Sequence, residues 1–110
     1  VRDMLWIDDL LDAYQLALNR PEQVAGKIFN IGGGPAYTLS IWAEVEPLLE
    51  ALAKRQVEVG RGAWRPGDQK VYISDISKAK QEMGWRPNVS PQDGLRRLWE
   101  WVSANTGLFE

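Results

Sequence analysis

The sequence predicts an α/β domain of about four helices with short strands, and three features support this. Apolar residues repeat at helical spacing in four stretches of the 110-residue chain. Proline and glycine fall near the ends of those stretches. Short apolar or alternating runs at residues 2–6, 27–31 and 57–59 are typical of strands. The length and a hydrophobic content of 45% suit a single domain over residues 1–110 that buries one core.

The first predicted helix begins at Ile7 and ends before Pro21. Asp8 and Asp9 lie in its first turn, where acidic side chains favour the positive end of the helix dipole. Two adjacent carboxylates could also hold a metal ion or act as an acid and base pair, but their position favours a helix start. The apolar positions that follow the helical repeat are Ile7, Leu10, Leu11, Tyr14, Ala17 and Leu18.

A glycine-rich turn, residues 32–34 followed by Pro35, comes directly after the predicted strand at 27–31. A turn of this kind can hold a phosphate group on its backbone amides. However, its spacing matches neither the dinucleotide fingerprint nor a phosphate loop. We therefore interpret it as a structural turn.

The second predicted helix spans residues 40–54, and Pro47 falls inside it. Proline removes one backbone hydrogen bond and crowds the preceding turn, so we expect a kink or a restart there. The side chains expected to point inward are Ile41, Val45, Leu48, Leu49 and Leu52.

Two further helices are predicted in the C-terminal third of the chain. One begins near Asp75 as N-cap and ends at Gly84, after which Trp85 folds back on the last turn. It is expected to bury Ile76, Ala79 and Met83. The other begins with Ser90 as N-cap and Pro91 as first helical residue, and ends at Gly107. Its expected inner face comprises Leu95, Leu98, Trp99 and Val102, whereas Trp101 lies off this face and is free to pack elsewhere.

Residues 64–72 carry the most distinctive chemistry of the chain. Arg65 precedes a proline, which keeps its backbone extended, and the glycine that follows permits a sharp turn. A guanidinium group can grip a diphosphate through paired, charge-assisted hydrogen bonds, and Asp68 could accept hydrogen bonds from ribose hydroxyls. Asp68 and Tyr72 are four residues apart, so an extended chain places them on the same side. The alternative is a surface turn with one solvated ion pair.

Composition excludes several classes of function. A net charge of −2 and a pI near 5.2 give no basic surface for nucleic acid. No apolar run is long enough to span a membrane. Without cysteine or histidine the chain has neither disulfides nor the commonest metal ligands, so we expect no metal site and a reducing, cytoplasmic location. Because Val1 lies within a strand-like run, we expect the chain to be a piece of something longer.

Five groups of motifs follow one another along the chain. They are Val1-Arg2-Asp3 with Asp8-Asp9-Leu10-Leu11-Asp12-Ala13, Phe29-Asn30-Ile31-Gly32-Gly33-Gly34, Trp64-Arg65-Pro66-Gly67-Asp68-Gln69, Ser74-Asp75-Ile76-Ser77-Lys78-Ala79 and Gly84-Trp85-Arg86-Pro87. In this order they resemble the C-terminal part of extended short-chain dehydrogenase/reductases, the NAD-dependent nucleotide-sugar epimerases and dehydratases, and among these the CDP-paratose 2-epimerases. The resemblance implies an incomplete C-terminal portion of that fold, lacking the N-terminal Rossmann domain.

The resemblance also implies roles for four residues in binding a nucleotide-diphosphate sugar. Arg2 and Arg65 match arginines that contact the diphosphate, and Asp68 matches an acid close to the ribose. Tyr72 matches a position that lines the sugar pocket. The alternative for Arg2 is an exposed residue near the start of the chain.

The chain departs from the family where the chemistry is done. The family's N-terminal half carries the glycine-rich dinucleotide fingerprint and a Tyr-x-x-x-Lys pair. Here Tyr14, Tyr37 and Tyr72 have no lysine four residues later. We therefore expect this chain to contain no catalytic residue and to have no epimerase or dehydratase activity alone. We also expect it to bind no NAD, although complete family members use NAD as cofactor.

Two interpretations remain open. The chain is either the substrate-binding lobe of a nucleotide-sugar epimerase, without its cofactor domain, or a detached lobe that associates with itself or a partner and binds no ligand. In the family, the cofactor domain covers part of the first helix and residues 29–31. Without that cover an apolar surface is exposed, so we expect either a homodimer or a partner that supplies the cofactor domain.

Overall fold

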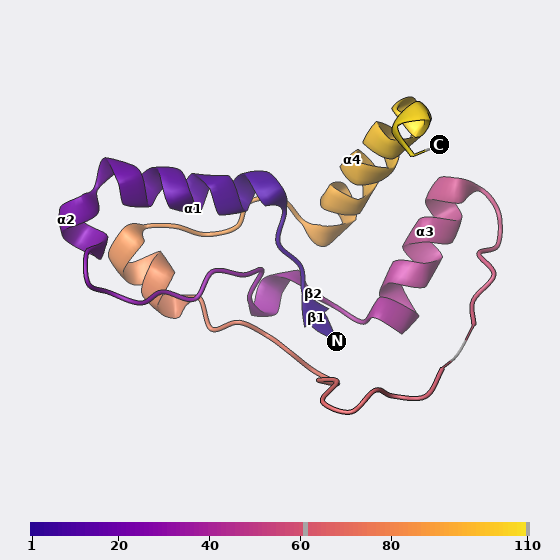
Figure 1. The fold of residues 1–110 in the computed structure, drawn as a ribbon, viewed down its shortest axis with the longest axis horizontal. Coiled ribbons are helices and arrows are strands. Elements are labelled where there is room, and N and C mark those ends of the chain that lie inside the picture. The colour runs from indigo at the N-terminus through magenta and orange to yellow at the C-terminus, as the bar shows by residue number, and fades with distance from the viewer. Residues whose placement is uncertain (61, 110) are drawn as a thin grey trace.

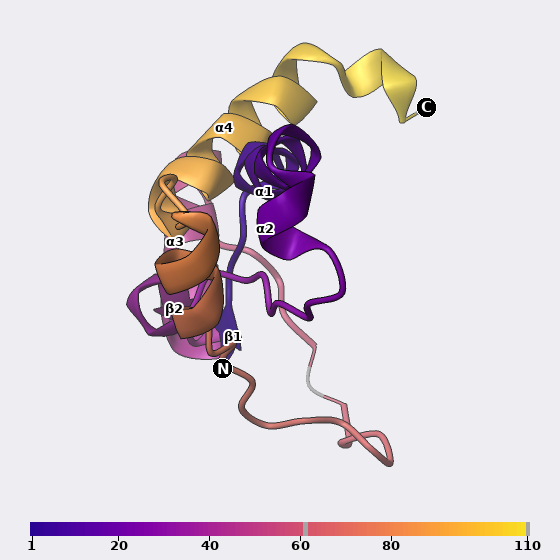
Figure 2. The same ribbon diagram turned by 90° about the vertical axis from the view of Figure 1, so that its left-hand side faces the viewer.

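The computed structural model describes residues 1–60 and 62–109, which form helices around a small two-stranded sheet (Figure 1). The molecule measures 50 × 35 × 24 Å along its principal axes. Helices α1 and α2 lie with the π-helix η3 at one end of the long axis, which faces the viewer in Figure 2, and α3 packs against α4 at the other end (Figure 1). The elements in chain order are β1 (Arg2–Asp3), α1 (Ile7–Asn19), α2 (Pro21–Val24), η1 (Pro35–Tyr37), β2 (Thr38–Leu39), η2 (Ile41–Val45), α3 (Glu46–Ala53), η3 (Ala79–Met83), α4 (Pro91–Ala104) and η4 (Thr106–Leu108).

The sheet brings together segments that are far apart in the sequence. β1 and β2 pair antiparallel, with Arg2 opposite Leu39 and Asp3 opposite Thr38. On its other side Arg2 forms a parallel bridge with Tyr72. The predicted α/β class, dominated by helices, is confirmed.

The predicted strands are largely wrong in position. The strand expected over residues 2–6 is shortened to Arg2–Asp3, and residues 27–31 and 57–59 are not strands. A strand forms only when a neighbouring backbone pairs with it, and one backbone group in each of these segments bonds to a side chain. The Ile28 carbonyl accepts a hydrogen bond from Lys78 Nζ at 2.9 Å, and the Val57 N–H donates to the Glu50 carboxylate at 3.1 Å.

The first helix forms as predicted and leaves most of its apolar repeat exposed. α1 is followed directly by the single turn of α2, which begins at Pro21. The residues that α1 buries are Asp9 and Ala13. The apolar side chains of α1 on its solvent side, with their exposed fractions, are Ile7 (55%), Leu11 (54%), Tyr14 (61%) and Leu18 (76%). We call these four residues the α1 stripe.

The core centres on Trp85, which is 2% exposed. It packs with Ala13, Ala79 and Met83, as predicted for a residue that folds back on the preceding helix. Its indole N–H donates to the Asp9 carbonyl oxygen at 2.8 Å, which ties this part of the chain to α1. The helical segment 77–83 ends at Gly84, whose positive φ of 70° is typical of a helix C-terminus. At its start, Asp75 accepts hydrogen bonds from the Ser77 N–H and hydroxyl and so caps it as predicted.

The helix predicted over residues 40–54 forms in two parts. Ser40 caps the π-helix η2 by accepting the Ala43 N–H at 3.1 Å. The α-helix α3 then begins at Glu46, with Pro47 in its first turn. The predicted restart at the proline is therefore confirmed. Val45 is buried and the leucines of α3 are half-buried, but Ile41 is 47% exposed because it lies at the rim of a cavity described below.

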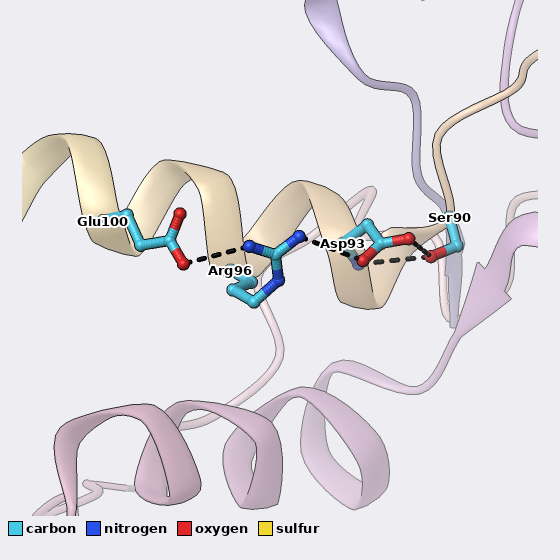
Figure 3. Close-up of polar contacts among 4 residues, drawn as sticks. All are labelled: Ser90, Asp93, Arg96 and Glu100. Carbon is cyan, nitrogen blue, oxygen red and sulfur yellow. Dashed lines mark hydrogen bonds and ion pairs between the residues drawn. The ribbon is translucent and has the colours of Figure 1, made fainter.

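The start of α4 is fixed by local bonds (Figure 3). Ser90 Oγ accepts the Asp93 N–H at 3.2 Å, which confirms the predicted N-cap. On the helix surface Arg96 pairs with Glu100 at 3.0 Å and with Asp93 at 3.4 Å (Figure 3). Hydrogen bonding to Glu100, and then to Asp93, raises the pKa of the Arg96 guanidinium.

The inner face predicted for α4 is only partly correct. Leu95, Trp99 and Val102 are half-buried, but Leu98 is 49% exposed. Trp101 lies off this face, as predicted, and packs edge-on against Phe109 with ring centroids 6.1 Å apart. No helix in residues 1–60 or 62–109 is both long enough and apolar enough to cross a membrane.

Candidate functional site

The arginine predicted to contact a diphosphate lies in a tight turn formed by residues 65–68. The Asp68 N–H donates to the Arg65 carbonyl at 3.1 Å, and Gly67 has a φ of 85°, so the turn has the features of a type II turn. The Asp68 carboxylate also accepts the Arg65 backbone N–H at 3.1 Å and forms an ion pair with Nε at 3.4 Å. The Arg65 side chain is 85% exposed. Local sequence thus places the guanidinium and the carboxylate side by side at the surface.

Arg2 reaches this turn from β1. Its two terminal nitrogens donate to the carbonyl oxygens of Val1 and Gln69. A guanidinium has five N–H donors, so two bonds to backbone can orient it and leave capacity for a ligand. Arg2 is half-buried in the structure rather than a freely exposed terminal residue.

A single open cavity joins Arg2, Arg65 and Asp68. It has a volume of about 480 Å³, within the range of ~300–1,000 Å³ that is usual for small-molecule sites. Lys70 also lines it, so the lining includes three cationic side chains and the carboxylate of Asp68. Such a balance favours an anionic ligand. The other described lining residues are Val1, Ser40, Ile41, Trp42, Trp64 and Gln69.

Tyr72 is near this cavity but is not among its described lining residues. Its backbone N–H donates to the Val1 carbonyl at 3.1 Å, and its carbonyl accepts the Asp3 N–H at 3.2 Å. Its hydroxyl lies 3.5 Å from Ser74 Oγ. Three of the four predicted residues, Arg2, Arg65 and Asp68, therefore line one cavity. The fourth, Tyr72, lies next to Arg2 because the backbones of the two residues form a parallel bridge.

No role was predicted for Lys70, which lines the cavity, or for Asp3. Its Oδ2 accepts backbone N–H groups from Gly34 at 3.0 Å and Ser74 at 3.2 Å. Burial of the carboxyl group opposes ionisation, but the hydrogen bonds from Gly34 and Ser74 outweigh it and hold the pKa of Asp3 below its ordinary value. The only sign in the sequence that Asp3 is structurally important is its place beside Arg2 in the motif Val1-Arg2-Asp3.

The glycine-rich turn is closed by its neighbours rather than open to a ligand. A Cβ at Gly33 would overlap the Met4 carbonyl oxygen, and one at Gly32 would overlap Ser74 Oγ and lie 2.6 Å from Asp3 Oδ2. Glycine is needed here because two chain segments approach so closely. The packing explains the glycines structurally, in agreement with the interpretation of the sequence.

The carboxylates at the start of α1 are also structural. Asp8 accepts the Trp6 indole N–H at 2.8 Å, and Asp9, which is 2% exposed, accepts the Val89 N–H at 3.0 Å. In the part of the chain that the structure describes, no cluster of three or more acidic residues could hold a metal ion.

A comparison with protein families assigns the chain to a class of protein. The sequence profile described as GDP-mannose 4,6 dehydratase matches residues 1–98. The chain therefore belongs to that family, the nucleotide-sugar epimerases and dehydratases of the extended short-chain dehydrogenase/reductases.

Individual members show how the chain relates to this family. It is 34% identical over 104 residues to CDP-paratose 2-epimerase of Salmonella typhi, covering 94% of this chain and 30% of that protein. It is 29% identical over 115 residues to dTDP-glucose 4,6-dehydratase of Escherichia coli, covering all of this chain and 31% of the relative. The chain thus spans about a third of the length of the curated relatives it matches.

Two solved structures have a fold similar to that of this chain. UDP-glucose 4-epimerase of Thermotoga maritima, crystallised with UDP-glucose, superposes with a TM-score of 0.78 at 28% identity, over 96% of this chain and 32% of that one. WbmF of Bordetella bronchiseptica, in complex with NADH, superposes with a TM-score of 0.70 at 24% identity and shows the shared fold alone. An incomplete portion of the family fold, as predicted, is confirmed.

Proposed function

We propose that the cavity beside β1 binds the diphosphate of a nucleotide sugar, and that the chain is the substrate-binding part of an NAD-dependent epimerase or dehydratase. The observation that carries this proposal is the meeting of Arg2 and Arg65, from opposite halves of the sequence, at one cavity. Two arginines that line the same cavity are suited to a ligand with two adjacent phosphates. The Thermotoga relative crystallised with UDP-glucose supports the choice of ligand class.

Each residue has a distinct part in this proposal. Arg65, exposed and steadied by Asp68 through Nε, presents its terminal nitrogens to the diphosphate. Arg2 is oriented by backbone carbonyls and contacts the same group from β1. The family resemblance assigns Asp68 to the ribose and Tyr72 to the sugar.

We place the redox chemistry outside this chain. NAD serves complete family members as hydride acceptor, but the glycine-rich turn does not fit it. Met4 and Ser74 already occupy the space beside Gly32 and Gly33, so their backbone offers no open cradle for a pyrophosphate. What the chain itself contributes is binding and orientation of the nucleotide sugar.

Calorimetric titration of CDP and UDP into the 110-residue chain tests this proposal. Arg65→Ala should weaken binding by about 1.5–3 kcal/mol, the scale of a hydrogen bond to a charged group. Arg96→Ala is a matched control, because Arg96 also pairs with carboxylates but lies on the surface of α4. Unchanged affinity in Arg65→Ala would remove that residue from the site.

A second function is favoured by the α1 stripe. Its four apolar side chains are each more than half exposed, and exposed apolar patches commonly mark interaction surfaces. Beside it lies a cavity of about 540 Å³ lined in part by Tyr14, Phe29 and Met83. We propose that this surface is covered by a second copy of the chain, or by a partner that supplies the cofactor domain. If the chain binds no nucleotide, this association becomes its main function.

A further inference from the structure

A separate cavity of about 400 Å³ lies between the glycine-rich turn and the helical segment 77–83. It shares none of its described lining residues with the cavity that holds Arg2 and Arg65. Its volume is within the range of ~300–1,000 Å³ that is usual for small-molecule sites. Its size and its separate position make it a candidate site for a second ligand.

One wall of this cavity is apolar and is held in place by the fold. The side chains of Tyr37, Ile76 and Pro87 line it and are half-buried. Ile76 packs against the core, and its Cδ1 would lie only 2.9 Å from a Cβ at Gly34. The backbone of Tyr37 is fixed because its carbonyl accepts the Met4 N–H at 2.8 Å. A wall that is already ordered loses little conformational entropy when a ligand packs against it.

Two cationic side chains, Lys80 and Arg86, line the same cavity. Among residues 1–60 and 62–109, neither charged group has a hydrogen bond or an ion pair. Lys80 follows Ala79, which is fully buried in the core. Arg86 lies between the buried Trp85 and Pro87, whose ring restricts the backbone before it. The cavity therefore combines two unpaired positive charges on fixed backbones with an apolar wall.

One carboxylate partly balances these charges. Asp75 lines the cavity and accepts hydrogen bonds from the Ser77 hydroxyl at 2.6 Å and the Ser77 N–H at 2.9 Å. The bond from the hydroxyl, and then that from the N–H, lowers the pKa of Asp75, so the group is ionised at neutral pH. The two cations minus this one anion leave a single positive charge, which favours a ligand with a single negative charge.

We infer that this cavity is a binding site for a small amphipathic monocarboxylate, a molecule with one carboxylate on an apolar, aromatic body. The carboxylate pairs with Arg86 and Lys80, because a guanidinium fork matches the geometry of a carboxylate. The apolar body lies against Tyr37 and Ile76. This site is independent of the proposed function, since neither Arg2 nor Arg65 lines the cavity.

Calorimetric titration of naphthoate into the 110-residue chain tests the inference. Naphthamide has the same apolar body without the charge, and acetate has the charge without the body. Both should bind at least about 10-fold more weakly than naphthoate, which is ~1.4 kcal/mol, because each lacks one of the two contacts. Naphthyl phosphate, with up to about two negative charges, should bind no more tightly than naphthoate.

Single substitutions locate the site. Lys80→Gln and Arg86→Gln should each weaken naphthoate binding by about 5-fold, the scale of an exposed ion pair. Lys54→Gln and Arg20→Gln are the matched controls, because they remove the same charges at exposed positions that follow α3 and α1. Both controls should bind naphthoate as the wild type does.

NMR spectra give an independent readout of where naphthoate binds. The amide signals of Ala36 and Ser77, which line the cavity, should shift when naphthoate is added. Those of Leu11 and Leu18 in the α1 stripe should not. Addition of CDP should leave the shifts at Ala36 and Ser77 unchanged, because the two cavities are separate.

Four results would overturn the inference. The first is the absence of naphthoate binding, and the second is equal binding of naphthoate and naphthamide. The third is unchanged affinity in both Lys80→Gln and Arg86→Gln, or shifts confined to the α1 stripe, which would place the ligand elsewhere. The fourth is tighter binding of naphthyl phosphate, which would exclude a monocarboxylate as the preferred class. Loss of CDP binding in Arg65→Ala with naphthoate binding intact would support two separate sites.

Discussion

The Asp3 carboxylate accepts the backbone N–H of Ser74 at 3.2 Å, although the two residues are 71 positions apart. The same oxygen accepts the Gly34 N–H. One side chain therefore joins β1, the glycine-rich turn and the segment that follows the arginine-bearing turn. Because Arg2 is its neighbour in β1, Asp3 sets where Arg2 meets the cavity. We regard it as a positioning residue.

Asp3→Asn should destabilise the fold and weaken ligand binding. The substitution removes the charge that two backbone N–H groups share, and hydrogen bonds to charged groups contribute about 1.5–3 kcal/mol. We expect a decrease of about 1–3 kcal/mol in the free energy of unfolding, measured by urea denaturation. Asp12→Asn, at an exposed position on α1, is the control and should change it little. Equal stability of the two variants would contradict the role given to Asp3.

The same carboxylate predicts a dependence of stability on pH. Its folded pKa lies below the ordinary value of 3.8, so the unfolded chain takes up the proton first as the pH falls. The stabilisation from ionised Asp3 is complete above the unfolded pKa and is lost as the pH falls through the lower folded pKa. Urea denaturation at a series of pH values from about 6 down to about 2 should therefore show a shallower acid loss in Asp3→Asn than in the wild type. Parallel curves would refute this.

Gly33→Ala should be strongly destabilising. The added methyl group would overlap the Met4 carbonyl oxygen, so the backbone on one side must move. Overpacking of this kind costs about 1–3 kcal/mol or more. Gly60→Ala is the matched control, because nothing lies within 4 Å of a Cβ there. Thermal unfolding followed by circular dichroism should show a lower midpoint for Gly33→Ala only, and a shared midpoint would argue against close packing of the turn.

The α1 stripe should make the chain self-associate. Burying an exposed side chain of this size is worth ~1.5–3 kcal/mol, so four of them can offset association costs of ~4–15 kcal/mol. Light scattering at micromolar concentration should give about twice the monomer mass of 12.5 kDa. Leu11→Lys combined with Leu18→Lys should restore the monomer without weakening the helix, since lysine has a helix propensity close to that of leucine.

The control for self-association is Leu108→Lys, which changes a leucine that is 69% exposed outside α1. It should remain a dimer. A wild-type mass near 12.5 kDa would show instead that the exposed stripe is tolerated in the monomer or is meant for a different partner.

The purified chain should not turn over CDP- or UDP-sugars, even with added NAD. Tyr14, Tyr37 and Tyr72 each lack a lysine four residues later, so the acid/base pair used by the family is missing. Analysis of the sugar products by NMR after prolonged incubation checks this. Any epimerised or dehydrated product formed without another protein would overturn the assignment of the chemistry to a different part of the enzyme.

The sequence by itself determined several helix starts and ends, because their signals are local. The end expected at Gly107 is wrong, since α4 ends at Ala104 and residues 106–108 form the separate 3₁₀-helix η4. Ser90 with Pro91 starts α4, Pro47 restarts the second helix as α3, and Gly84 ends the helical segment 77–83. Each of these effects acts within one or two turns of its own residue, so no knowledge of the fold was needed. The turn around Arg65 was also readable, since a proline followed by glycine favours it wherever it stands.

Only the tertiary structure decided the strands, the cavity and the exposed surface. Residues 27–31 and 57–59 have strand-like composition, but strand formation depends on a pairing partner elsewhere in the chain. The family resemblance related Arg2 to Arg65, but the cavity between them exists because Asp3 and Tyr72 hold β1 against the later segment. An amphipathic pattern shows that one face of a helix is apolar, and whether anything covers that face is a property of the folded molecule, as the α1 stripe demonstrates.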